Sequence, residues 1–151
     1  MLEVTSVAQL RALVGTEAAV SPWMEVSQQR VSTFADATSD HQWIHVDAQR
    51  CERESPFGKP VAHGFLTLSL LPAMFESAIS LRNFRMVLNY GLNKVRFPAP
   101  VPVGSRVRAR LVLKAVDAID GGSQLLWDVT VEREGEAKPG CVAEFVMRCY
   151  S

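Results

Sequence analysis

The densest group of acids, bases and amides in this sequence lies at residues 39–47, which read Ser-Asp-His-Gln-Trp-Ile-His-Val-Asp. Asp40 and His45 stand five positions apart within it. A carboxylate and an imidazole that converge on one point bind a single water, so that one takes its proton while the other supplies a proton to a substrate. The residue types therefore favour general acid and base catalysis, but their spacing does not establish that the side chains converge.

Two other interpretations of this segment stay open at the level of sequence. Asp40 suits a helix N-cap and His45 a hydrogen-bonded loop position, which are the commoner roles of such residues. A metal site is the second alternative, because His41 and His45 are four residues apart and His63 is near in sequence. The zinc-protease helix pattern fails, since Gln42 stands where its glutamate would be, and we expect no metal.

A second signal is the segment Pro60–Phe65, in which Gly64 opens a long apolar stretch. The first amide hydrogens of a helix have no partner within that helix, and they favour negative charge. A thioester oxygen resting against the Gly64 amide would be polarised, and an enolate-like oxygen would be stabilised most in the transition state. Alternatively, Gly64 only lets the helix approach its neighbours closely.

Hydrophobic spacing predicts the helices that must position these residues. Residues 27–39 place Val31, Phe34, Ala35 and Thr38 on one face, which predicts a short amphipathic helix that delivers residues 40–47 as a loop. Residues 64–81 are apolar on nearly every side, and we expect a buried helix with no solvent face. Pro72 removes a backbone donor within it and predicts a kink or a break.

The rest of the chain predicts strands. Polar and apolar residues alternate, or turn residues bound apolar runs, in four segments: residues 86–97, 106–111, 124–134 and 141–150. Because these strands are consecutive, antiparallel pairing is the simple solution, and the sheet must curl around the apolar helix to cover both hydrophobic surfaces. We therefore expect an α+β fold.

Composition limits the possible functions. The 151 residues, 48% of them hydrophobic, predict one domain over residues 1–151, and the balance of 16 basic and 16 acidic residues disfavours nucleic-acid binding. The sequence has no secretory signal, no membrane-spanning stretch and no disulfide-like cysteine spacing, which predicts a soluble, cytoplasmic protein. Phosphate-loop, dinucleotide and serine-hydrolase motifs are absent. The alternating Arg106, Arg108 and Arg110 fit a solvated strand face better than a phosphate site.

Over nearly its whole length the sequence resembles the MaoC-like family, which includes the R-specific enoyl-CoA hydratases and has the hot-dog fold. Residues 34–47 are similar to the family's hydratase motif Gly-Asp-x-Asn-Pro-x-His, and residues 57–65 and 95–104 are similar to its other recurrent blocks. With Gln42 and Trp43 in this motif, the sequence is similar to 3-hydroxyacyl-thioester dehydratases and to nodulation-protein-N-like proteins. The resemblance implies a long antiparallel sheet wrapped around a central buried helix.

The resemblance also implies residue roles. Asp40 and His45 would form the catalytic pair, and the Gly64 amide would be the oxyanion donor. Substrate binding or orientation would fall to Gln42, Trp43 and His63. The sequence departs from the motif at three positions, where glycine, asparagine and proline are replaced by Ser39, Gln42 and Trp43.

The implied activity is hydration of trans-2-enoyl thioesters of CoA or acyl carrier protein to the R-3-hydroxy product, and the reverse dehydration. No metal or redox cofactor is implied, and the expected assembly is a homodimer whose sheets join edge to edge. A hot-dog acyl-CoA thioesterase is the alternative among enzymes. A non-catalytic acyl-thioester binding module is the alternative of another class, and the three motif departures are its main support.

Overall fold

Alternation of polar and apolar side chains builds the long strands in the computed structural model, which describes residues 1–151. In β7 (Gly122–Arg133) every second residue from Ser123 to Val131 is buried, so one face of the strand packs on the core. The other long strands are β5 (Met86–Arg96), β6 (Arg106–Ile119) and β8 (Cys141–Tyr150). All four predicted strands are confirmed, and β6 continues eight residues beyond the predicted end at Leu111.

The long strands belong to a six-stranded sheet in the order β2-β6-β7-β8-β5, where β2 is Glu17–Val20 and β3 (Met24–Glu25) also pairs with β6. Consecutive antiparallel pairing is confirmed for β6, β7 and β8. It is wrong for β5, which pairs with β8 rather than with β6. The connection from β5 to β6 contains Pro98, Pro100 and Pro102, which have no amide hydrogen to donate in a hairpin ladder. It carries the chain past the positions of β8 and β7 to that of β6 in the same sheet.

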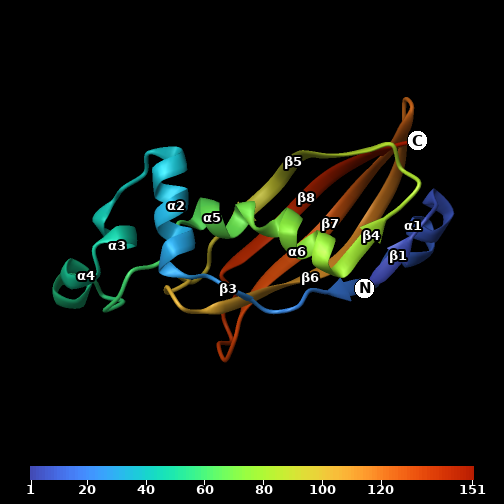
Figure 1. The fold of residues 1–151 in the computed structure, drawn as a ribbon. Helices are drawn as coiled ribbons and strands as arrows, with labels where there is room; N and C mark the ends of the chain where they lie inside the picture. Colours follow the sequence, from blue (N-terminus) through green and yellow to red (C-terminus); the bar gives the residue numbers. More distant parts are fainter.

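The predicted break at Pro72 divides the central helix into α5 (Gly64–Ser69) and α6 (Leu71–Ala78). Pro72 lies in the first turn of α6, where its missing amide hydrogen would have no helical partner. The helix ends at Ala78, and residues 79–81 instead form β4 (Ile79–Leu81), which pairs in parallel with β1 (Leu2–Val4). Figure 1 shows α5 and α6 crossing one face of the curved sheet.

Packing between this helix pair and the sheet forms the core, in which Phe75 of α6 meets Trp127 of β7 edge to face at 5.2 Å between ring centroids. The expectation of a helix without a solvent face is wrong for the single chain. Phe65 is 70% exposed, and Ser69, Ala73 and Glu76 continue the exposed stripe at helical spacing. One sheet covers only one side of the helix pair, so the other side is left uncovered.

The segment around residues 27–54 is more helical than predicted. α2 (Gln28–Thr38) begins at the N-cap Ser27 as expected, with Val31 and Ala35 buried and Thr38 exposed. Residues 40–47 are not a simple loop, because they include α3 (Trp43–Val46), and α4 (Ala48–Glu54) follows. The carboxylate of Asp47 caps α4 by accepting from the Arg50 amide at 3.0 Å, which ends α3 and starts the next helix within one residue.

The N-terminal residues form β1 and α1 (Val7–Leu13), two short elements that hydrophobic spacing did not predict. None of the helices combines the length and the apolar character that a bilayer-spanning segment needs.

Candidate active site

The fold brings Asp40, His45 and His63 together from three places. Asp40 follows α2, His45 lies on α3, and His63 immediately precedes α5. One donor atom from each side chain lies within 4.8 Å of the other two. The convergence that residue spacing left open is therefore present in the structure.

His45 is held so that one ring nitrogen is free. The side chain is buried, and Nδ1 lies 2.6 Å from the main-chain oxygen of Val61. Because a carbonyl oxygen only accepts hydrogen bonds, Nδ1 carries the hydrogen and Nε2 keeps its lone pair. The interpretation of His45 as a hydrogen-bonded residue thus holds for Nδ1, while Nε2 remains available for chemistry.

Burial lowers the pKa of His45 below its ordinary value of 6.5, and the neighbouring His63 acts in the same direction. The Val61 hydrogen bond and the charge of Asp40 oppose this shift without reversing it. A lowered pKa leaves the imidazole neutral near pH 7, so Nε2 is ready to accept a proton from water.

Main-chain contacts fix the turn that carries His45. The Gln28 side-chain amide donates to the His45 carbonyl oxygen at 3.0 Å, and the Val61 amide donates to the Ile44 carbonyl at the same distance. The buried Cys51 thiol contacts the carbonyl oxygens of Trp43 and Ile44 at 3.6 Å. Sequence analysis missed Gln28, although a glutamine one turn before the buried Val31 on the inner face of α2 is a detectable signal.

The Asp40 carboxylate remains accessible beside this turn. Its side chain is 54% exposed, and Oδ2 lies 4.0 Å from Nε2 of His63. The N-cap interpretation receives little support, because the residue at the N-cap of α3 is Gln42 and the Asp40 Oδ1 contact to the Gln42 amide is long, at 3.4 Å. The carboxylate is therefore free to accept hydrogen bonds from a water molecule.

The three donors suit a metal ion poorly. The rings of His45 and His63 are stacked, with centroids 3.7 Å apart and planes inclined by 23°. Imidazole binds metals in its own plane, so an ion in the plane of one ring would lie well out of the plane of the other. His41, the other histidine of the metal hypothesis, instead pairs with Asp36 at 2.8 Å on the surface.

The structure bears on both interpretations of Gly64. Its amide, at the first position of α5, donates to no other protein group. A Cβ at this position would lie 2.9 Å from the ring of Phe97, so close packing also requires glycine. The free amide follows His63 directly in the chain, and the His63 side chain belongs to the group with Asp40 and His45.

The side chains of the two remaining predicted residues, Gln42 and Trp43, form no hydrogen bond with the reactive atoms of the group. Gln42 is exposed, and its side-chain amide forms no hydrogen bond with Asp40 or His45. Trp43 is half-buried, with the Arg50 guanidinium 4.2 Å above its ring. Neither side chain forms a hydrogen bond that would orient Asp40 or His45 in the single chain.

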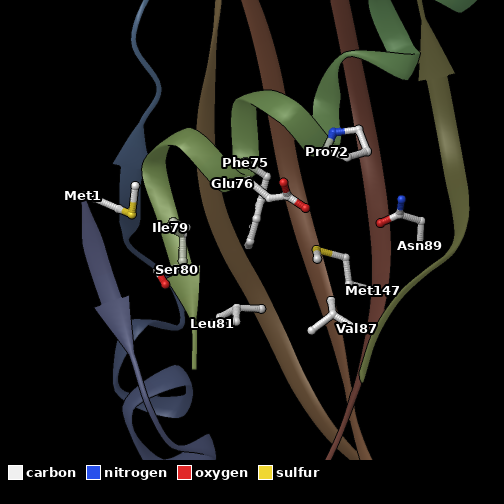
Figure 2. Close-up of a pocket in the computed structure, with 10 residues that line it drawn as sticks. All are labelled: Met1, Pro72, Phe75, Glu76, Ile79, Ser80, Leu81, Val87, Asn89 and Met147. Atoms are coloured by element: carbon white, nitrogen blue, oxygen red, sulfur yellow. The ribbon is translucent and has the colours of Figure 1, made fainter. Parts of the chain in front are cut away.

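A cavity of about 480 Å³ lies farther along the central helix, between α6 and the strands β5 and β8 (Figure 2). Its apolar lining includes Phe75, Ile79, Leu81, Val87 and Met147. Sequence analysis did not predict this cavity, because its walls come from segments far apart in the chain.

The three alternating arginines do not offer a phosphate site. Arg108 and Arg110 each donate to the Glu132 carboxylate, Arg110 also reaches Glu17 at 3.0 Å, and Arg106 pairs with Glu134 at 3.3 Å. The predicted solvated strand face is confirmed, and its charges are mutually paired.

Comparison with known proteins identifies the family. A sequence model described as the MaoC like domain matches residues 9–134. The chain belongs to the MaoC-like family. The 3-hydroxyacyl-thioester dehydratase Z of Mycobacterium tuberculosis strain H37Rv is 51% identical over 144 residues, which cover 95% of each protein. Nodulation protein N of Rhizobium leguminosarum bv. viciae is 48% identical, over 93% of this chain and 89% of that protein.

Solved structures of R-hydratases share the fold. The unliganded R-hydratase PhaJ1 of Pseudomonas aeruginosa superposes with a TM-score of 0.71 at 19% identity, over 91% of this chain and 82% of that one. The (R)-hydratase of A. caviae gives 0.69 at 20% identity, over 88% and 96%. The predicted α+β hot-dog fold is confirmed.

Proposed function

We propose that this MaoC-like protein catalyses the R-specific hydration of trans-2-enoyl thioesters and the reverse dehydration of R-3-hydroxyacyl thioesters. The observation that carries the proposal is the meeting of the Asp40 carboxylate with a neutral His45 whose Nε2 is free. The dehydratase named among its relatives and the R-hydratases among its structural neighbours support the same reaction class.

In the proposed reaction, Asp40 and His45 hold one water between them. Nε2 of His45 accepts a proton as the water oxygen bonds to C3 of the enoyl thioester, and the pair delivers a proton to C2. The double bond becomes a single bond, with a hydroxyl on C3 and a hydrogen on C2. The Gly64 amide donates to the thioester oxygen, where negative charge develops.

The acyl chain is proposed to occupy the cavity between α6 and β5. Two observations support this placement: the cavity lies along the same helix pair that begins at Gly64, and more than half of its lining residues are hydrophobic. Burial of an alkyl chain there would stabilise the complex by roughly 0.8 kcal/mol for each methylene group.

The thioester carrier, CoA or acyl carrier protein, belongs to the same proposal, as does a homodimer formed through β5. The free edge of β5 carries Met86, Val87, Leu88, Tyr90 and Leu92, all exposed in the single chain. A second copy paired along this edge would cover them. The three cysteines are buried and unpaired, which fits the proposed cytoplasmic location.

Purified protein with crotonyl-CoA and longer trans-2-enoyl-CoAs tests the function, without added metal or nucleotide. We expect loss of the enoyl absorbance and an R-3-hydroxy product on chiral analysis. The S isomer, or no turnover at any chain length, would contradict the proposal. Release of free thiol from saturated acyl-CoA, detected with a thiol-reactive dye, would instead identify a thioesterase. Binding of an acyl-CoA with hydration no faster than in buffer alone would identify a non-catalytic module.

A further inference from the structure

His63 touches both members of the proposed catalytic pair. Its Nε2 lies 3.0 Å from the main-chain oxygen of Asp40, 23 residues earlier in the chain, and its ring stacks on that of His45 with centroids 3.7 Å apart. Phe34 of α2 packs against His63 as well, at 4.9 Å between ring centroids. The side chain is only 3% exposed, so its position is set by these neighbours.

Neither ring nitrogen of His63 is available to a substrate. Nε2 faces a carbonyl oxygen and must therefore carry the hydrogen. Nδ1 is buried and has no hydrogen-bond partner in the protein. His63 is consequently unsuited to exchange protons with a substrate, whereas Nε2 of His45 is free to do so.

We propose that His63 is the positioning residue of this site, whose Nε2–H anchors the main chain of Asp40 and whose ring shields one face of His45 from water. The inference rests on the proposed hydratase function for its kinetic consequences. The two contacts themselves do not depend on which reaction the site catalyses.

Shielding by His63 has a consequence for the titration of His45. The titratable groups that act on His45 are Asp40 before α3 and His63 before α5. On the other packed elements, Cys51 of α4 contacts the Ile44 carbonyl and α2 presents the neutral Gln28. Burial is the main cause of the lowered His45 pKa. Removing the His63 ring admits water to His45, so the pKa of His45 should rise towards its ordinary value. Because a general base must be neutral, the acid limb of kcat/KM should then move to higher pH.

Two substitutions separate the hydrogen bond of His63 to the Asp40 main chain from the cover that its ring gives to His45. His63→Gln keeps an N–H near the Asp40 carbonyl but removes the ring, so we expect the acid limb to move to higher pH with a modest loss of kcat. His63→Phe keeps an aromatic face on His45 but removes the donor. We expect kcat to fall roughly 10- to 100-fold, as for a misplaced catalytic group, with a smaller movement of the acid limb than in His63→Gln. His41→Gln, at an exposed histidine outside the site, is the matched control and should change neither quantity.

Ring nitrogen NMR gives a readout that needs no activity, and the chain has only three histidines to assign. The wild-type protein should show hydrogen on Nδ1 of His45 and on Nε2 of His63. The His45 pKa should be higher in His63→Gln than in wild type. The opposite tautomers, or an unchanged His45 pKa in His63→Gln, would overturn the proposal.

Kinetics give a second way to contradict the proposal. Folded His63→Gln and His63→Phe variants that both keep the wild-type kcat and pH profile would overturn the positioning role. A wild-type protein that shows the expected tautomers and pKa change but hydrates no enoyl thioester would instead contradict the proposed function. The two failures are therefore distinguishable.

Discussion

Ser39 adopts a backbone conformation that is usual for glycine. It ends α2 with φ of 59° and ψ of 28°, the left-handed region that a helix C-terminus often requires. The hydratase motif of the family has glycine at this position, directly before the aspartate that matches Asp40. The geometry explains that preference, because a side chain in this region costs about 1–2 kcal/mol.

Ser39→Gly should therefore stabilise the protein. Relief of the left-handed strain outweighs the added freedom of glycine in the unfolded chain, about 0.4–1 kcal/mol, and we expect a net gain of roughly 0.5–1 kcal/mol. Urea unfolding with an unchanged m-value measures the difference. Ser39→Val, which adds a branched Cβ, should shift the midpoint in the opposite direction, and a less stable glycine variant would refute this explanation.

The sequence allowed prediction of the residue types in the site but not of their contacts. Asp40, His45 and Gly64 were predicted because they are chemically distinctive and match a motif. The bond from His45 Nδ1 to the Val61 carbonyl spans 16 residues, and the bond from Gln28 to the His45 carbonyl spans 17. Such contacts depend on how α2, α3 and the strand connections pack, which no local pattern specifies.

At the scale of elements, strand positions followed from two-residue periodicity, whereas the place of β5 in the sheet did not. Periodicity shows which face of a strand is buried, but the neighbour of an edge strand depends on the path of the connecting chain. The helical turn at α3 was missed for a related reason. Four residues are too few for a 3.6-residue period to be detected, and α3 is stabilised mainly by the contacts of its carbonyl groups.

The cavity between α6 and β5 leads to a prediction about acyl chain length. Val87 lines the cavity, and the next residue, Leu88, points to the opposite face of β5. Val87→Trp should lower the ratio of kcat/KM for long enoyl-CoAs to kcat/KM for crotonyl-CoA, because it adds bulk where the distal chain is proposed to lie.

Leu88→Trp is the matched control, since it adds the same bulk to the same exposed edge strand. A ratio of long-chain to crotonyl-CoA activity that is equal in the two variants would show that the acyl chain lies elsewhere.

At the scale of the whole molecule, two apolar features remain uncovered in the single chain: the edge of β5 and the side chain of Phe65 on α5. An exposed strand edge with large apolar side chains readily pairs with another chain. We therefore expect sedimentation equilibrium at micromolar concentration to give about twice the chain mass of 16.7 kDa. Dilution to the monomer should abolish hydration if both subunits line the site.

Leu88→Lys should weaken the proposed dimer, because a charged side chain replaces apolar contact along the paired edge. Ala137→Lys, in the exposed turn between β7 and β8, adds the same charge away from this edge and should leave the mass unchanged. A wild-type protein that sediments as a fully active monomer would exclude a site shared between subunits.

The central claim is that Asp40 and His45 carry the proton transfers of hydration. Its most direct test is the turnover of trans-2-enoyl-CoA by Asp40→Asn and His45→Gln, each compared with a matched surface variant, Asp36→Asn or His41→Gln. Circular dichroism must first confirm folding, above all for His45→Gln, because His45 is buried. We predict a loss on the order of 100-fold or more for each site variant and wild-type rates for the surface variants. Near-normal turnover by either folded site variant would contradict the assignment.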